Sequence, residues 1–368
     1  MNKVSFLLAF VILTASVTTV IASDGADAAQ STVTVTDGTG RTFTFEGPVD
    51  SIVTIGVGVT ATVIDLGALD RIVVCDSYSR NNPDSVFDGL RERVDRGLAS
   101  AGGNIYDSGK DQLRNDIVDA ADPGTGTFDR ERDVVFVTGS DAYRANIVPY
   151  LEDKGFVNVM QWYNITGYDD LVRFAETVSL VCTGHVEPVV GRMVDMVDYI
   201  DSTVSASGHD RAEAFYVTHS GGSFRVGNTD SVSTSMISAA GGDVVTLDPD
   251  EMATTYVANI TELVDGHPGV TVFVDDVIAS DPGRLESLMR LTGDSTVVPL
   301  DQIWNNYSTL SIDGVWMMAS AMYPDLFDGD VPDLSSDGSD VTVYLLASLA
   351  VASLICVLSV PFLRGGSR

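Results

Sequence analysis

Eight side chains that follow short apolar segments have the chemistry to hold a large ligand. Aromatic rings stack on planar molecules, and arginine guanidinium groups form charge-assisted hydrogen bonds with anionic oxygens. Together these residue types suit a planar or catecholate ligand. The candidates are Tyr78, Tyr143, Arg144, Trp162, His219, Arg225, Trp304 and Tyr307.

Several of these residues also have an ordinary structural interpretation. Trp162 and Trp304 could be half-buried packing residues, and Arg225 could be a surface arginine paired with an aspartate. His219 could be a solvated loop histidine. Tyr78 could ligate haem iron, although a tyrosine at a strand end more often forms a hydrogen-bonded rim.

Neither a metal site made by protein ligands nor a catalytic site is predicted. Zinc and manganese sites need several histidine and carboxylate ligands that converge. The histidines are scattered along the chain: His185, His209, His219 and His267. Asp275 and Asp276 could bind a cation, but adjacent aspartates are common in so acidic a chain. Because no nucleophile elbow and no phosphate-binding loop is present, we expect a binding protein without catalytic residues or a cofactor of its own.

The cysteines favour free thiols. Cys75 ends an apolar strand, Cys182 lies late in a helical run, and Cys356 falls in an apolar C-terminal segment. No pair has the spacing of zinc ligands. Cys75 and Cys182 are therefore expected to be buried and free, with a disulfide between them as the alternative.

Alternating strand and helix patterns must position the candidate side chains in the first half of the chain. Residues 33–36 and 42–45 alternate around a glycine-containing turn, which predicts a β-hairpin. Strands are then predicted at 51–55, 71–75, 133–137 and 156–160, and helices at 61–69 and 142–153. A polar insert at about 80–130 interrupts the pattern.

The second half repeats the alternation after the strongest helical pattern of the chain, which extends from 185 to about 205. Its predicted strands are 214–218, 243–246, 270–274 and 296–300, and its predicted helices are 231–240, 260–266, 283–291 and 311–323. We therefore predict an α/β fold with two Rossmann-like lobes joined by a single long helix. The carboxyl ends of the parallel strands should line a ligand cleft between the lobes.

Apolar segments at both ends indicate export and anchoring. The start of the chain has the pattern of a secretory signal peptide, with an uncleaved membrane helix as the alternative. Near the C-terminus an uncharged apolar segment is long enough to cross a hydrocarbon core of about 30 Å, and the arginines after it favour a cytoplasmic end. The expected organisation is 1–28 signal peptide, 31–182 N-terminal lobe, 183–207 joining helix, 208–328 C-terminal lobe, 329–340 acidic linker and 341–363 transmembrane anchor.

The charge balance excludes one class of partner. The chain has 52 acidic and 21 basic residues, for a formal net charge of −31. A surface this acidic repels nucleic acid. The composition is similar to that of proteins from salt-rich habitats, where screening tolerates self-repulsion. Asn164, Asn259 and Asn306 begin glycosylation sequons, which fit an exported protein.

Several stretches, taken in order, resemble the periplasmic binding proteins for iron–siderophore complexes, haem and cobalamin. The run TVTVTDGTGRTFTFEGPVDSIVTIG is similar to their V-T-D-x-x-G-R hairpin and first buried strand. SMISAAGGDVV, NITELVDGHPGVTVFV and SIDGVWMMASAMYPDLF are similar to later segments of the family. The resemblance covers about residues 33–328.

This resemblance implies the substrate-binding subunit of an ABC importer. Such a subunit captures an iron(III) chelate or a corrinoid outside the membrane and delivers it to a permease that a cytoplasmic ATPase drives. The family presents one acidic residue on each lobe to the permease. Glu262 matches that position in the second lobe, and Asp116 is the candidate in the first, although either could be an ordinary surface acid.

Two other functions stay open at this point. Export, an anchor and sequons also fit a cell-surface adhesion or wall protein, and a metal oxyanion is an alternative ligand. For the insert at about 80–130, we expect a role in covering the cleft and setting the size of the ligand.

Overall fold

The computed structural model describes residues 32–106, 108–162, 165–229, 231–246, 255–300, 304, 307–328 and 332. The predicted signal peptide and anchor lie outside these residues, as do the acidic linker apart from Pro332 and the sequon residues Asn164 and Asn306. Within the described part, no helix combines the length and the apolar character needed to cross a membrane.

The predicted N-terminal hairpin is present and is attached to the first sheet through its turn. Its antiparallel strands are β1 (Val33–Thr36) and β2 (Thr42–Phe45). The buried carboxylate of Asp37 accepts hydrogen bonds from the backbone N–H of Thr39 at 2.9 Å and from that of Gln161 at 3.1 Å. The Gly38 N–H donates to the Gln161 carbonyl at 2.9 Å. Asp37 and Gly38 of the hairpin motif therefore join the hairpin to the edge of the sheet.

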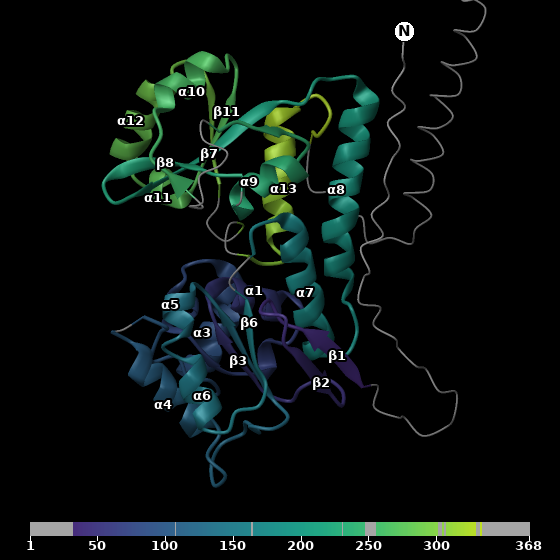
Figure 1. Cartoon of the computed structure of the whole chain (residues 1–368), viewed down its shortest axis with the longest axis vertical. Coiled ribbons are helices and arrows are strands. Elements are labelled where there is room, and N and C mark those ends of the chain that lie inside the picture. The colour runs from purple at the N-terminus through teal and green to yellow at the C-terminus, as the bar shows by residue number, and fades with distance from the viewer. Residues whose placement is uncertain are drawn as a thin grey trace, which may run out of the picture.

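Four parallel strands form the sheet of the first lobe, called lobe one, in the order β4-β3-β5-β6 (Figure 1). They are β3 (Ile52–Ile55), β4 (Ile72–Cys75), β5 (Val134–Thr138) and β6 (Val159–Trp162). Valine and isoleucine dominate because helices cover both faces of the sheet and leave no strand face in water.

The helices of lobe one differ from the prediction at two points. They are α1 (Val57–Asp65), α5 (Asp141–Arg144) and α6 (Val148–Asp153), with the 3₁₀ turn η1 (Leu69–Arg71) before β4. The helix predicted at 142–153 is two helices, because Pro149 has no N–H and its ring would clash with a continuous preceding turn. Helix α1 begins at Val57, earlier than the predicted 61.

The polar insert has helices of its own. They are η2 (Ser85–Phe87), α3 (Asp88–Asp95) and α4 (Lys110–Ala120), and α2 (Ser77–Asn81) lies just before them, after β4. A few apolar residues in these helices, Phe87, Leu90, Leu113 and Ile117, are fully buried against the lobe. The insert is therefore packed onto lobe one through a few apolar side chains. These were not recognised in the sequence because most of the insert is polar.

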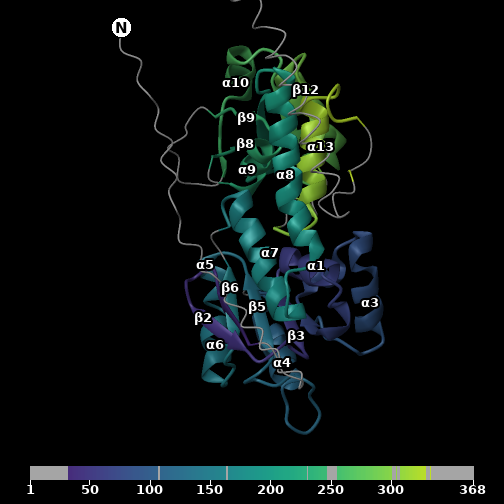
Figure 2. The same ribbon diagram turned by 90° about the vertical axis from the view of Figure 1, so that its right-hand side faces the viewer.

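One long helix joins the lobes, as predicted, and a second helix packs beside it. Helix α7 (Tyr168–Thr183) contacts β1 and α1, and α8 (Pro188–Ser207) then continues toward the second lobe (Figures 1 and 2). The joining helix was predicted to begin at 183, but Gly184 ends α7 in a left-handed conformation with φ of 80°, and Pro188 opens α8. With 20 residues, α8 is about 30 Å long.

The second lobe, called lobe two, has a mixed sheet with the strand order β10-β8-β7-β11-β12, and β9 pairs with β7. Its strands are β7 (Glu213–Ser220), β8 (Ser223–Gly227), β9 (Asp243–Val244), β10 (Thr255–Tyr256), β11 (Thr271–Val274) and β12 (Thr296–Pro299). Its helices are α9 (Val232–Ala239), α10 (Ile260–Gly266), α11 (Asp276–Ala279), α12 (Pro282–Thr292) and α13 (Ser311–Met322). Strands β8 and β10 were not predicted. Gly221 and Gly222 both have positive φ and form a two-residue turn that pairs β8 with β7.

The two described cysteines are free, as expected. Cys75 and Cys182 are both fully buried. Burial raises the pKa of the Cys182 thiol to about 12, since the thiolate would be poorly solvated there. Both thiols are therefore protonated packing groups at neutral pH.

Candidate ligand-binding site

The carboxyl edges of the two sheets face each other (Figures 1 and 2). Helices α1 and α5 follow the carboxyl ends of β3 and β5 on the side of lobe one that is nearer to lobe two. In lobe two, α11 follows β11 on the side that is nearer to lobe one, whereas α10 lies at the far end. Loops that follow parallel strands from both lobes therefore meet between them, where ligands of open α/β sheets bind.

In lobe one this edge is held by a buried aspartate. Asp76 is only 2% exposed, and its carboxylate accepts hydrogen bonds from the backbone N–H of Gly56 at 2.6 Å and of Tyr78 at 2.8 Å. Burial raises the pKa of Asp76, and the hydrogen bonds from the backbone and from Ser79 oppose that shift. Asp76 thus ties the start of α1 to the start of α2 and fixes the two loops that follow β3 and β4.

Gly56 is the tightest point of this edge. Its φ of 123° and ψ of 137° are accessible to glycine and costly for other residues. A Cβ at this position would lie 1.8 Å from Thr138 Oγ1, at the end of the neighbouring strand β5. Close packing of the loop after β3 against the end of β5 therefore requires glycine at this position.

Tyr78 lies on this edge with its ring in solvent. It follows β4 in α2, is 53% exposed, and contacts Tyr106 of the insert with ring centroids 5.4 Å apart. Tyr106 was not among the predicted site residues. An isolated tyrosine in a polar stretch carries no periodic signal, so only the path of the insert could reveal it.

Arg144 and Trp162 are also at this edge but are buried. The guanidinium of Arg144 donates to the Gln161 side chain and to the Gly139 carbonyl, and it pairs with Asp141. The Trp162 ring packs edge-on against Phe174 with centroids 5.1 Å apart. This position of Trp162 is the packing alternative that the sequence left open.

Tyr143 lies between these residues in the chain, within α5. Its side chain is outside the described part of the structure. Its role therefore stays a prediction.

In lobe two a second buried aspartate occupies the equivalent place. Asp275 follows β11 and caps α11, and its carboxylate accepts hydrogen bonds from Tyr216 Oη at 3.1 Å and from Thr218 Oγ1 at 2.5 Å. Burial and the neighbouring Asp275 carboxylate raise the pKa of Tyr216, which stays a neutral donor. Asp276 points outward and is exposed. The two adjacent aspartates therefore have different surroundings: Asp275 is hydrogen-bonded within lobe two, and Asp276 is in solvent.

His219 and Arg225 lie on the β7–β8 hairpin. The His219 ring meets Phe224 edge-on with centroids 5.4 Å apart, and the histidine is half-buried. Arg225 donates through Nε to Thr255 Oγ1 at 3.0 Å and through its terminal nitrogen to the Thr255 carbonyl. Arg225 thus holds β10 against β8 instead of pairing with an aspartate.

Trp304 and Tyr307 precede α13. Trp304 is half-buried and packs over Gly314, where an added Cβ would lie 2.9 Å from the Trp304 Cβ. Tyr307 is exposed and has a positive φ of 53°, which is unusual for a residue with a side chain. Tyr307 is 40% exposed as a whole residue, but burial raises the pKa of its phenol, so its hydroxyl end is the more buried part.

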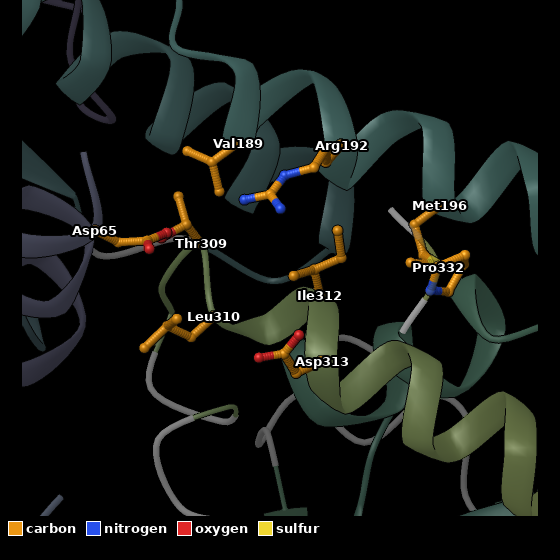
Figure 3. A pocket seen from close by; sticks show the side chains of 9 residues that line it. All are labelled: Asp65, Val189, Arg192, Met196, Thr309, Leu310, Ile312, Asp313 and Pro332. Carbon is orange, nitrogen blue, oxygen red and sulfur yellow. The ribbon is translucent and has the colours of Figure 1, made fainter. Parts of the chain in front are cut away.

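A separate cavity of about 190 Å³ lies where α1, α8 and α13 approach one another (Figure 3). Arg192 extends into it from α8, Asp65 from the end of α1 and Asp313 from α13. Burial and the nearby Asp65 raise the pKa of Asp313, and Arg192 opposes that shift. Thr309 also lines this cavity, is fully buried, and its hydroxyl has no hydrogen-bond partner. None of the predicted ligand residues lines this cavity.

The candidate docking residues differ in their surroundings. Glu262 is exposed in the first turn of α10, where a carboxylate is favoured by the helix dipole. Asp116 is half-buried and accepts hydrogen bonds from the Gly102 N–H at 2.9 Å and from Gln112 Nε2 at 2.7 Å. Asp116 thus has a local role in holding the insert. Across the described residues, no group of three or more histidine, cysteine or carboxylate side chains is arranged to hold a metal ion.

No family model and no curated protein matches the sequence. Solved structures do match. A protein of an ABC-type Fe³⁺-hydroxamate transport system from Saccharomonospora viridis aligns with a TM-score of 0.54 and 18% identity over 79% of this chain and 98% of its own. The chain has the fold of the periplasmic binding proteins.

Two further structures share this binding-protein fold. The periplasmic haem-binding protein RhuT from Roseiflexus sp. RS-1 aligns with a TM-score of 0.53 and 15% identity, over 75% of this chain and 98% of its own. The periplasmic vitamin B12-binding protein BtuF of Vibrio cholerae aligns with a TM-score of 0.53 and 12% identity, over the same shares. The ligand class differs among these proteins, so the fold alone does not identify the ligand. The residues of the site determine which ligand binds.

Proposed function

We propose that this chain is the substrate-binding subunit of an ABC importer that captures an iron(III) chelate or a corrinoid outside the cell. The observation that carries the proposal is the meeting of two carboxyl edges, one from each lobe, in a fold that hydroxamate-, haem- and B12-associated proteins share. A large ligand would find exposed aromatic residues on both lobes, Tyr78 after β4 of lobe one and Tyr307 between β12 and α13 of lobe two. The proposed role is capture and delivery without catalysis.

The two ends of the sequence complete the proposal. A cleaved or uncleaved leader would export the chain, and the apolar segment 341–363 would hold it at the cytoplasmic membrane with the lobes outside. A tether keeps a binding protein close to its permease and raises its effective concentration there. Glu262 is the proposed docking residue on lobe two.

Ligand capture is tested by tryptophan fluorescence of the full chain in detergent at high salt. The probes are a ferric tris-hydroxamate, a ferric tris-catecholate, haemin and cyanocobalamin, with free Fe³⁺ and Zn²⁺ as controls and a correction for ligand absorbance. Saturable quenching by a chelate or a corrinoid at micromolar concentration or below supports the proposal. A response to free ions alone contradicts it and indicates a site for a metal ion. A response to none of the probes contradicts it and favours an oxyanion ligand or a role in adhesion.

Docking is tested separately by reversing the charge at Glu262. In membranes that contain the permease and the ATPase, Glu262→Lys should lower uptake several-fold and leave ligand affinity unchanged. Asp294→Lys, at an exposed acid that follows α12 of lobe two, is the matched control. Equal effects of the two variants would show that total charge, rather than a docking contact, controls uptake.

A further inference from the structure

The insert follows the β4 edge of lobe one toward the proposed ligand site. Ser100 forms a parallel bridge with Val74, and its carbonyl accepts a hydrogen bond from the Cys75 N–H at 2.9 Å. Farther along, the Gly103 carbonyl accepts from the Ser77 N–H at 2.6 Å. Residues 100–103 thus extend the sheet beside β4 and reach its carboxyl end.

The next residues anchor the insert on the other side of the edge. Ile105 is buried, and its carbonyl accepts a hydrogen bond from Asn146 Nδ2 at 3.2 Å, in the loop between α5 and α6. Held at both sides, residue 106 cannot move far from the edge. The backbone here is fixed further because the Tyr106 carbonyl accepts from the N–H groups of Gly109 and Lys110, each at 2.9 Å.

This path places two tyrosine rings together in solvent. Tyr78 is 53% and Tyr106 is 38% exposed, and their planes meet at 84°. Among the described side chains, the exposed large aromatic residues are Tyr78, Tyr106 and Tyr307. Two of the three, Tyr78 and Tyr106, are therefore in contact at the edge of lobe one that faces lobe two. We call this pair the aromatic corner.

Perpendicular rings suit one shape of ligand. A flat ring system can stack on the face of one tyrosine and receive the edge of the other, which satisfies both preferred aromatic geometries at once. A chelate built of aliphatic chains and hydroxamate groups has no such face, so the same corner offers it only general apolar contact.

We propose that Tyr106, together with Tyr78, selects ligands with a planar aromatic or tetrapyrrole face over chelates without one. The proposal rests on the proposed capture function and narrows its substrate class. It also gives the insert a defined role, since Tyr106 reaches the site only because residues 100–105 are anchored at both sides.

The test compares Tyr106→Leu, Tyr106→Phe and a control, Leu98→Ser, in the full chain. Leu98 is an exposed apolar residue of the same insert and has no ring. Affinities are measured by fluorescence titration for haemin, a ferric tris-catecholate and a linear ferric tris-hydroxamate that has no aromatic ring. Tyr106→Leu should weaken binding of the planar ligand about 3- to 12-fold. Tyr106→Phe and Leu98→Ser should change it less than about twofold, and hydroxamate binding should not change.

Each other result overturns the proposal. Unchanged affinity of Tyr106→Leu for the planar ligands, or an equal loss for the hydroxamate, would show that Tyr106 does not select for a flat face. Binding of the hydroxamate alone by the unmodified chain would refute the aromatic corner while the capture function stands. If the unmodified chain binds none of the probes, both proposals fail together.

Discussion

Gly56→Ala should be one of the most destabilising single substitutions at the ligand edge. The φ of 123° and ψ of 137° at Gly56 cost a residue with a Cβ about 1–3 kcal/mol. The added Cβ would also lie 1.8 Å from Thr138 Oγ1, so the threonine must rotate and give up its 3.1 Å hydrogen bond to the Ile55 carbonyl, at about 1 kcal/mol. The expected loss in unfolding free energy is about 2–4 kcal/mol, a large share of the usual total.

Urea unfolding followed by circular dichroism measures this loss, with Gly155→Ala as the matched control. Gly155 also has a positive φ, 83°, but an added Cβ there would meet no atom within 4 Å. Its substitution should cost only the backbone term, about 1–2 kcal/mol. The difference between the two variants combines the contact with Thr138 and the larger backbone cost at Gly56, so a further variant is needed to separate them.

A double substitution tests the cause directly. Thr138→Ala removes Oγ1, and the next atom of Thr138, its Cβ, is 3.2 Å from the added methyl group. Gly56→Ala combined with Thr138→Ala should therefore be less destabilising than the sum of the single changes by about 1 kcal/mol or more. If the energies add, or if Gly56→Ala costs no more than Gly155→Ala, the steric argument for this edge is wrong.

Three further predictions concern buried polar groups. The pKa of Cys182 is raised from 9.0 to about 12, so the folded state favours the neutral thiol. The unfolding free energy of the unmodified chain should therefore exceed that of Cys182→Ala by a constant amount below pH 9, and this difference should fall as the pH rises from 9 toward 12. Urea unfolding at each pH measures the difference. Thr309→Val should raise the unfolding free energy by about 1 kcal/mol, because it removes a buried hydroxyl that has no partner. Thr60→Val should lower the unfolding free energy, because it removes a hydroxyl that forms hydrogen bonds with Thr54 and Gly56. If urea unfolding shows that both variants change the unfolding free energy in the same direction, this account is wrong. Asp275→Ala should destabilise by about 2–4 kcal/mol in thermal unfolding because it leaves its buried donors unpaired, and Asp276→Ala, at the exposed neighbour, by less than about 0.5 kcal/mol.

Much of the architecture could be predicted from local patterns. Runs of valine and isoleucine predicted the parallel strands, because a strand buried on both faces needs apolar residues at every position. The hairpin motif predicted β1 and β2, and the structure adds the reason for its aspartate, which joins the turn to Gln161. The hairpin of β7 and β8 was missed, since no strand was predicted after Gly221 and Gly222.

The candidate site was harder to predict than the fold. The predicted strands show which residues follow a strand end, and they placed Tyr78, Arg144 and Trp162 at the carboxyl edge of one sheet. They do not show which of these side chains is exposed to solvent. In the structure Arg144 and Trp162 are buried among neighbours from distant segments, and Tyr78 is not.

The sequence by itself determined that two α/β lobes form, because hydrophobic period and glycine placement act within a few residues of the chain. Only the tertiary structure decided which side chains the two edges present. Tyr106 reaches Tyr78 through hydrogen bonds to β4 and to Asn146, contacts between segments tens of residues apart. Such contacts depend on the path of the whole insert, and no local pattern encodes that path.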